Sequence, residues 1–227
     1  VDTSLGRIVD DEEIKADLAA QHPYEKWLTE GLTELSSLPA REHVVYSNDS
    51  VMRRQQMFGY TEEELKVILG PTARTASEPL GSMGTDTPIA VLSDRSRLLF
   101  DYFQQLFAQV TNPPLDAIRE EVVMSTESLL GSEVNLLGET ALHARMLRLE
   151  TPTLTTSELE RIKRCNITGF ESKTIKTLFK RSEGPLGLKL ALQRVREEAT
   201  SAVEAGATII ILSDRGVDKD HIAIPSL

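Results

Sequence analysis

Apolar residues recur at intervals of three and four positions along much of this chain, and that spacing is typical of helices that bury one face. Several of these segments also begin at a capping residue or end at glycine or proline. The pattern predicts helices over residues 12–20, 24–35, 51–58, 61–69, 97–110, 155–165 and 184–205. On the last of them we expect the buried face to consist of Leu188, Leu192, Val195, Ala199 and Val203.

Two short apolar runs read as strands instead. They are Pro88–Leu92 and Thr208–Leu212, and each is followed by Ser-Asp-Arg. The second run comes directly after a long helix and Gly206, which is the order of elements in a βα repeat. We therefore expect both strands in one sheet, with their Ser-Asp-Arg turns on the same edge.

This pattern predicts an α/β fold: a helical N-terminal lead-in, followed by an incomplete barrel-like or open βα sheet domain. Residues 36–50 are polar and lack periodicity, so we interpret them as a linker. The expected organisation is a lead-in over residues 1–40 and a central α/β domain over residues 41–227. The chain begins with Val1 and ends abruptly, so we expect that it either was processed or is a piece of a longer protein.

Composition narrows the class of protein. The formal net charge of −10 argues against a phosphate backbone or an anionic membrane surface as partner. The apolar runs are too short to span a bilayer, and the N-terminus does not resemble a signal peptide. A single cysteine, Cys165, cannot form an internal disulfide. A reducing, cytoplasmic setting is expected.

Candidate chemistry is sparse. His22, His43, His143 and His221 lack metal-ligand spacing, and Cys165 lacks an evident base, so we interpret them as structural. The loop Gly81-Ser82-Met83-Gly84 offers backbone donors for a phosphate, but it leads into a predicted strand and lacks the lysine of a nucleotide loop. Asp94-Arg95 and Asp214-Arg215 follow the predicted strands, and we favour helix caps there over site residues.

Four motifs resemble the central domain of the glutamate synthase large subunit. The first runs from Arg54 to Lys66, and the second from Glu78 to Pro88. The third is Asp101-Tyr102-Phe103-Gln104-Gln105-Leu106-Phe107-Ala108-Gln109-Val110-Thr111-Asn112-Pro113-Pro114, and the fourth spans Ile209 to Val217. The N-terminal segment, with Gly6-Arg7-Ile8-Val9-Asp10-Asp11-Glu12-Glu13, resembles the family's exit from an amidotransferase domain.

The resemblance implies an oxidoreductase parent in glutamate biosynthesis and nitrogen assimilation. Such a parent makes two glutamates from glutamine and 2-oxoglutarate: an amidotransferase domain releases ammonia, which travels through a tunnel to an FMN domain fed by a 3Fe-4S cluster. The resemblance places none of the catalytic, cofactor-binding or metal-binding residues in this chain. It implies that Met83 and Thr111 line the ammonia tunnel; the alternative is ordinary packing.

Other functions stay open from the sequence. They are a stand-alone small-molecule-binding regulator and an enzyme that binds a phosphate or flavin group through the Gly81 loop. The resemblance implies partners within the parent, namely its amidotransferase and FMN domains, and a small electron-donating subunit. The electron donor, either a nicotinamide cofactor or ferredoxin, cannot be read from these residues.

Overall fold

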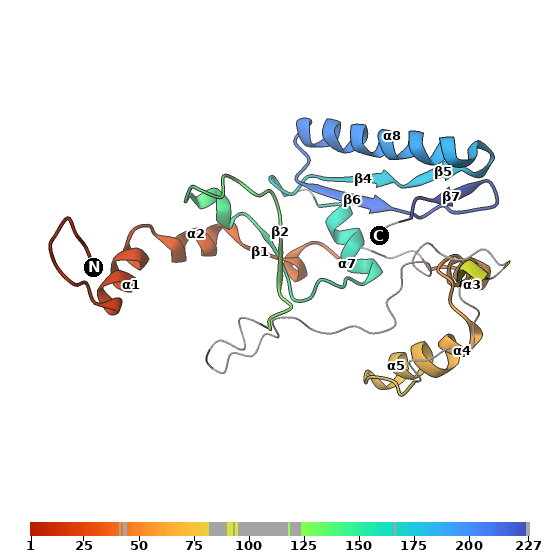
Figure 1. Ribbon diagram of the computed structural model, residues 1–227, viewed down its shortest axis with the longest axis horizontal. Coiled ribbons are helices and arrows are strands. Elements are labelled where there is room, and N and C mark those ends of the chain that lie inside the picture. Colours follow the sequence, from red (N-terminus) through yellow and green to blue (C-terminus); the bar gives the residue numbers. More distant parts are fainter. Residues whose placement is uncertain are drawn as a thin grey trace. The chain divides into compact units, whose positions relative to one another are not determined.

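The computed structural model describes residues 1–40, 42, 45–81, 90–92, 94, 118, 124–165 and 167–225. Contacts divide the chain into two units, Val1–His43 with Asp116–Ile224, and Val44–Leu115 with Pro225–Leu227. Helices and small sheets occur together (Figure 1), so the predicted α/β class is confirmed. The described residues form no closed barrel.

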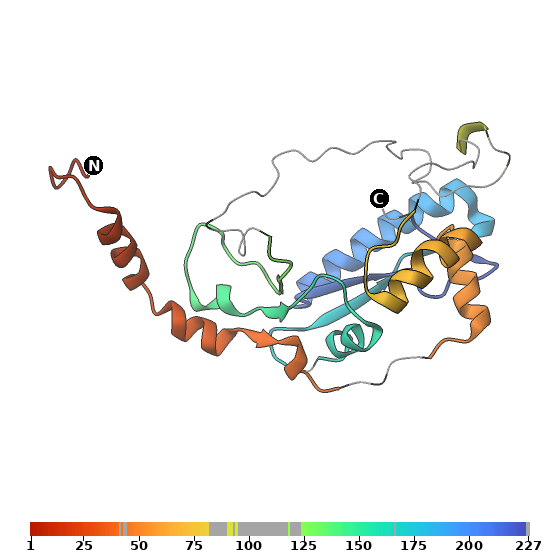
Figure 2. The same cartoon turned by 90° about the horizontal axis from the view of Figure 1, so that it is seen from below.

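The C-terminal part of the first unit is a βαβ arrangement. Strands β4 (Ser172–Lys176) and β6 (Ile209–Ser213) are parallel, and helix α8 (Gly184–Glu204) connects them. Figures 1 and 2 show α8 lying along the strands. The predicted sequence of helix, glycine and strand is therefore confirmed at this position.

The first strand of this arrangement changes partner along its length. After β4 the chain continues as β5 (Leu178–Lys180), which pairs antiparallel with β7 (His221–Ala223). Thr177 stands at the change: its N–H donates to Ser213 O at 2.8 Å, and its carbonyl accepts from Ile224 N–H at 2.8 Å. A short 3-10 turn, Arg181–Glu183, then leads into α8.

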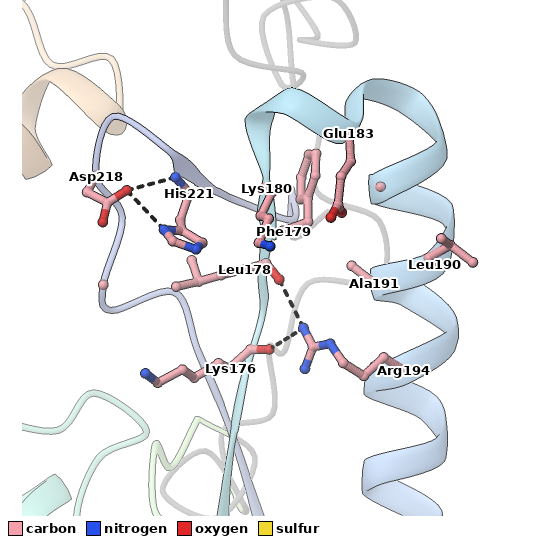
Figure 3. A pocket seen from close by; sticks show the side chains of 12 residues that line it. Lys176, Leu178, Phe179, Lys180, Glu183, Leu190, Ala191, Arg194, Asp218 and His221 are labelled. Atoms are coloured by element: carbon pink, nitrogen blue, oxygen red, sulfur yellow. Dashed lines mark hydrogen bonds and ion pairs between the residues drawn. The ribbon is translucent and has the colours of Figure 1, made fainter.

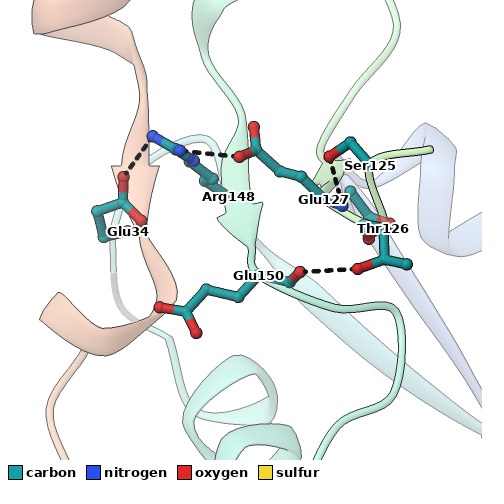
Figure 4. A network of polar contacts seen from close by, with 7 residues as sticks. Glu34, Ser125, Thr126, Glu127, Arg148 and Glu150 are labelled. Carbon is teal, nitrogen blue, oxygen red and sulfur yellow. Dashed lines mark hydrogen bonds and ion pairs between the residues drawn. The ribbon is translucent and has the colours of Figure 1, made fainter. Parts of the chain in front are cut away.

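A second sheet of the same unit has the strand order β1-β3-β2. Its strands are β1 (Thr33–Glu34), β2 (Ser128–Leu130) and β3 (Leu147–Leu149), preceded by helices α1 (Asp11–Ala20) and α2 (Tyr24–Gly31). On the solvent side Arg148 forms two salt bridges (Figure 4). Its Nη1 lies 3.4 Å from Glu34 Oε1, and its Nη2 lies 2.8 Å from Glu127 Oε2. Its neighbours Leu147 and Leu149 point the other way and are buried, as alternation along a strand requires.

The core of this unit lies where the second sheet, α7 (Thr156–Lys163) and β6 meet. Its buried members are Leu35, Leu38, Leu147, Leu149, Ile162, Phe170 and Ile209. The interpretation of residues 36–50 as linker is wrong at its start, because Leu38 is only 2% exposed. Arg161 holds this segment by donating to the carbonyls of Ser36 and Leu38 at 3.2 and 3.4 Å.

Glu160 on α7 is the buried charged side chain among the described residues. Lys163 Nζ lies 2.9 Å from one carboxylate oxygen, and Arg164 Nε lies 3.5 Å from the other. The hydrogen bond from Lys163, opposed by burial and helped by nearby cations, lowers the pKa of Glu160 below its ordinary value of 4.5. The folded protein therefore holds the carboxylate form more firmly than the unfolded chain does.

This shift predicts an acid-dependent loss of stability. A lowered folded-state pKa stabilises the fold above the unfolded pKa near 4.5, and the contribution disappears as pH falls through the folded value. Glu160→Gln should lower the free energy of unfolding by about 1–3 kcal/mol at neutral pH, because it leaves Lys163 without its carboxylate. Urea unfolding at several pH values checks this: the difference in unfolding free energy between the unmutated chain and Glu160→Gln should become smaller below pH 4.5. A difference independent of pH contradicts it.

The second unit contains α3 (Asn48–Met57) and a longer helical stretch. That stretch begins at the predicted capping box of Thr61 and Glu64, which is confirmed. It runs through α4 (Glu62–Glu64), a π-helical segment (Leu65–Leu69) and α5 (Gly70–Thr75).

The helix therefore does not end at Leu69 as predicted. The N–H of Gly70 donates to Leu65 O, five residues back, and this wider turn leaves room for the ring of Pro71. Glycine is needed at position 70, because a Cβ there would lie 2.9 Å from Leu65 O.

The predicted strand at Pro88–Leu92 is wrong in its described part. Ala90–Leu92 forms a 3-10 turn, and Val91 and Leu92 are more than 70% exposed. No described sheet contains this segment, so the shared sheet with the 208–212 strand is not observed. Short apolar runs fit a strand or a helical turn equally well, which explains the error. The predicted helix over residues 97–110 lies outside the described residues.

The buried face of α8 agrees with the prediction only in part. Leu188, Val195 and Ala199 are half-buried. The buried positions are Gly187, Ala191 and Ala202, whereas Leu192 and Val203 are 40% and 59% exposed. Small residues allow the helix backbone to approach the strands closely, so the larger apolar side chains lie along the flanks.

Candidate functional site

A cavity of about 690 Å³ lies between the β4–β5 strand and the first turns of α8 (Figure 3). Leu178, Phe179, Leu190 and Ala191 supply apolar lining, and Lys176, Lys180, Glu183, Arg194, Asp218 and His221 supply charged or titratable groups. It lies past the carboxyl ends of the parallel strands β4 and β6, where open α/β sheets usually bind ligands. This position makes it the main candidate site in the described chain.

Two glycines permit this geometry. Gly216, in the loop between β6 and β7, has a φ of +108°, a conformation that favours glycine. Gly187 brings the start of α8 against the strand, because a Cβ there would lie 2.5 Å from Glu183 Cβ and 3.4 Å from a ring carbon of Phe179. Larger residues at either position would strain or displace the walls of the cavity.

Arg194 crosses from α8 to the strand and is fully engaged in structural bonds. Its Nη2 donates to Lys176 O at 3.0 Å and to Leu178 O at 2.9 Å (Figure 3). Its Nη1 donates to Glu198 Oε1 at 2.9 Å. A guanidinium with these bonds fastens the helix to the strand. Arg194 therefore has a structural role in the lining of the cavity, and these bonds occupy N–H groups of its guanidinium.

Asp218 organises the loop on the opposite side. Its Oδ1 accepts from the N–H groups of Asp220 and His221, both at 2.8 Å, and lies 3.1 Å from His221 Nδ1. These hydrogen bonds lower the pKa of Asp218 below its ordinary value, and the bond from the Asp220 N–H has the largest effect. The carboxylate is thus anionic and is used to hold the turn.

The lining offers charged groups that could recognise a polar ligand. Lys176 and Lys180 contribute ammonium groups, and among the described residues that line the cavity there is no serine, threonine or cysteine. A histidine oriented by a carboxylate still needs a nucleophile or a substrate proton within reach. No residue pattern predicted this cavity; the one signal in the sequence is a pair of lysines four residues apart, Lys176 and Lys180, around Leu178 and Phe179.

The residues singled out from sequence fall mostly elsewhere. Met83, Thr111 and the Ser82–Gly84 part of the glycine loop lie outside the described residues, as do Arg95 and His43. The helix-cap interpretation of Asp214-Arg215 is wrong, because β6 ends at Ser213 and a turn leads into β7 instead of a helix. Ser213 Oγ accepts the Arg215 N–H in that turn at 3.3 Å.

The other histidines and the cysteine have structural surroundings. His22 stacks on Trp27 with ring centroids 5.0 Å apart, and His143 completes the cap formed with Thr140. Cys165 is half-buried against the core. Over the described ranges, no group of three or more His, Cys, Asp or Glu side chains is placed to hold a metal ion. Likewise, no described helix has the length and apolar character to cross a membrane.

Comparison with known proteins gives consistent matches. The family model described as "Glutamate synthase central domain" matches residues 53–227. The large chain of the NADPH glutamate synthase of Bacillus subtilis is 40% identical over the whole chain, and so is the NADH glutamate synthase of Schizosaccharomyces pombe. The ferredoxin-dependent chloroplastic enzyme of Oryza sativa is 36% identical, also over the whole chain. The chain spans 14%, 11% and 14% of these three relatives.

Proposed function

The chain belongs to the glutamate synthase family and carries its central domain, and on that premise we propose that it is a non-catalytic domain of a larger enzyme. It links a glutamine amidotransferase domain to an FMN domain and helps to wall the tunnel that carries ammonia between them. In this proposal residues 1–40 are the exit from the amidotransferase domain, and residues 41–227 are the central domain.

The observation that carries this proposal is the breadth of the match. The whole chain aligns at 36–40% identity with relatives whose names specify NADPH, NADH and ferredoxin as partners. A segment shared by enzymes with different electron donors serves a step that does not depend on the donor. Transfer of ammonia between the two half-reactions is such a step.

The polar side chains of the cavity serve the fold in this proposal. Its histidine and aspartate hold a turn, and its arginine fastens a helix to the strand. In the proposal, FMN and the 3Fe-4S cluster belong to other parts of the parent. Those parts, together with a small electron-donating subunit, are its partners, and Met83 and Thr111 are its tunnel residues.

The proposal predicts that the purified chain is inert. It should show no flavin absorbance, release no ammonia from glutamine, and reduce no 2-oxoglutarate, while the parent enzyme does all three under the same conditions. A yellow protein or measurable turnover by the chain alone contradicts the proposal. A metabolite that raises its melting temperature without turnover would favour a binding regulator instead.

A further inference from the structure

Strand β6 forms one side of a two-stranded sheet, and its other side has no strand beside it in the described part of the chain. The hydrogen bonds fix which amides face that side. Ile209 N–H donates to Glu171 O, and Ser213 O accepts from Thr177 N–H. The backbone N–H and C=O groups of the odd-numbered residues of β6 thus point towards β4. The N–H groups of Ile210 and Leu212 therefore point away from β4, along the open side.

The two open sides of this sheet differ in character. On the β4–β5 side, Arg194 caps the outward carbonyls of Lys176 and Leu178, and the β4 side chains are mainly polar or charged. Charged side chains and covered backbone groups are how proteins protect a true edge strand. Positions 209–212 of β6 are Ile-Ile-Ile-Leu, without charge, proline or capping side chain. Such an unbroken aliphatic run is typical of strands buried inside a sheet.

One face of β6 is also only partly covered, since Ile210 is half-buried and Leu212 is exposed. The register places Leu212 beside Ile175 and Ile210 beside Lys173, on the opposite face from the core residues Ile209 and Ile211. Helix α8 packs on the face that carries Leu212 and Ile175, and it lies mainly over β4 and β5. As a result Ile175 is buried to 1% exposure, while its neighbour Leu212 is 60% exposed.

We propose that β6 is an interior strand in the parent enzyme: an apolar strand of the parent polypeptide pairs with its open side, and further chain covers Leu212. The incomplete sheet expected from the sequence is thereby extended. This proposal rests on the proposed function only in requiring a longer parent. Relatives of which the chain is 14% have ample additional chain for this purpose. The Ile224 N–H bond to Thr177 O brings the chain, as it leaves β7, next to the Ser213 end of β6.

Amide hydrogen exchange in the intact parent tests the proposal. Ile210 and Leu212, which face the open side of β6, are compared with Thr174, which faces the open side of β4 and is the internal control. We expect Ile210 and Leu212 to exchange at least ~100-fold more slowly than Thr174, because only hydrogen-bonded amides are protected. Equal rates at the three amides overturn the proposal.

Dilution of the parent distinguishes the source of the strand. Protection of Ile210 and Leu212 that is unchanged while the enzyme dissociates to single chains supports a strand from the same polypeptide. Protection that disappears on dissociation assigns the open side to a second copy and overturns the proposal. Neither result depends on ammonia transfer, so a failure here is separate from a failure of the tunnel role.

Discussion

Replacing Met83 by tryptophan or Thr111 by arginine is expected to lower the ratio of glutamate formed to glutamine consumed by the parent enzyme, from two towards one. A thioether and a methyl-bearing hydroxyl make a narrow, weakly polar wall that suits neutral ammonia. A bulky ring would block such a passage, and a guanidinium would fill it with a charge and its water. Glutamine hydrolysis would then continue while ammonia escapes before it condenses with 2-oxoglutarate to form the imine that is reduced at the flavin.

The controls separate a blocked passage from a damaged enzyme. Glutamate synthesis from added ammonium should change little in both variants, because that route need not use the whole tunnel. The conservative variants Met83→Leu and Thr111→Val should keep the ratio near that of the unmutated enzyme. If the ratio of glutamate formed to glutamine consumed is unchanged in folded Met83→Trp and Thr111→Arg, both residues have only a packing role.

Phe170→Ala should give the largest loss of stability among single substitutions in the described core. The ring is 1% exposed and lies in the cluster that joins the two sheets through Leu147 and Ile209. Truncating a buried phenylalanine removes its transfer free energy and leaves a cavity, at a cost of about 3–5 kcal/mol. Urea unfolding of the purified chain measures the change.

Leu137→Ala is the matched control for that substitution. It deletes a large apolar side chain that is 97% exposed, so the free energy of unfolding should change by less than about 0.5 kcal/mol. A loss of stability in Phe170→Ala that is no larger than the small change in Leu137→Ala would mean that Phe170 is not a core residue. A loss below about 1 kcal/mol for Phe170→Ala would mean the same.

Local signals allowed the sequence to predict much of the secondary structure. The capping boxes at Thr61 and Thr155 were found because a hydroxyl and a glutamate three residues later act within one turn. The long helix α8 and strand β6 followed from uninterrupted periodicity and Gly206. Each of these elements depends on contacts between near neighbours in the sequence.

The errors arose where long-range contacts decide the outcome. Leu38 sits in a polar segment, and only the approach of α7 and β3 makes it a core residue. The buried face of α8 was predicted only in part: Leu192 and Val203 are exposed, because close packing against the strands favours the small residues Gly187 and Ala191. The cavity beside Thr177 exists because one strand changes from a parallel to an antiparallel partner, and no local pattern encodes that change.

The most direct measurement of the central claim uses glutamine labelled with ¹⁵N in its amide group, given to the parent enzyme in the presence of excess unlabelled ammonium. The proposed tunnel keeps ammonia away from solvent, so the glutamate made from 2-oxoglutarate should retain most of the label. The label should fall sharply in Met83→Trp and Thr111→Arg. In the unmutated enzyme, dilution of the label beyond that expected from its rate with ammonium alone would contradict a walled passage, and full retention in both variants would contradict the place of these residues in its wall.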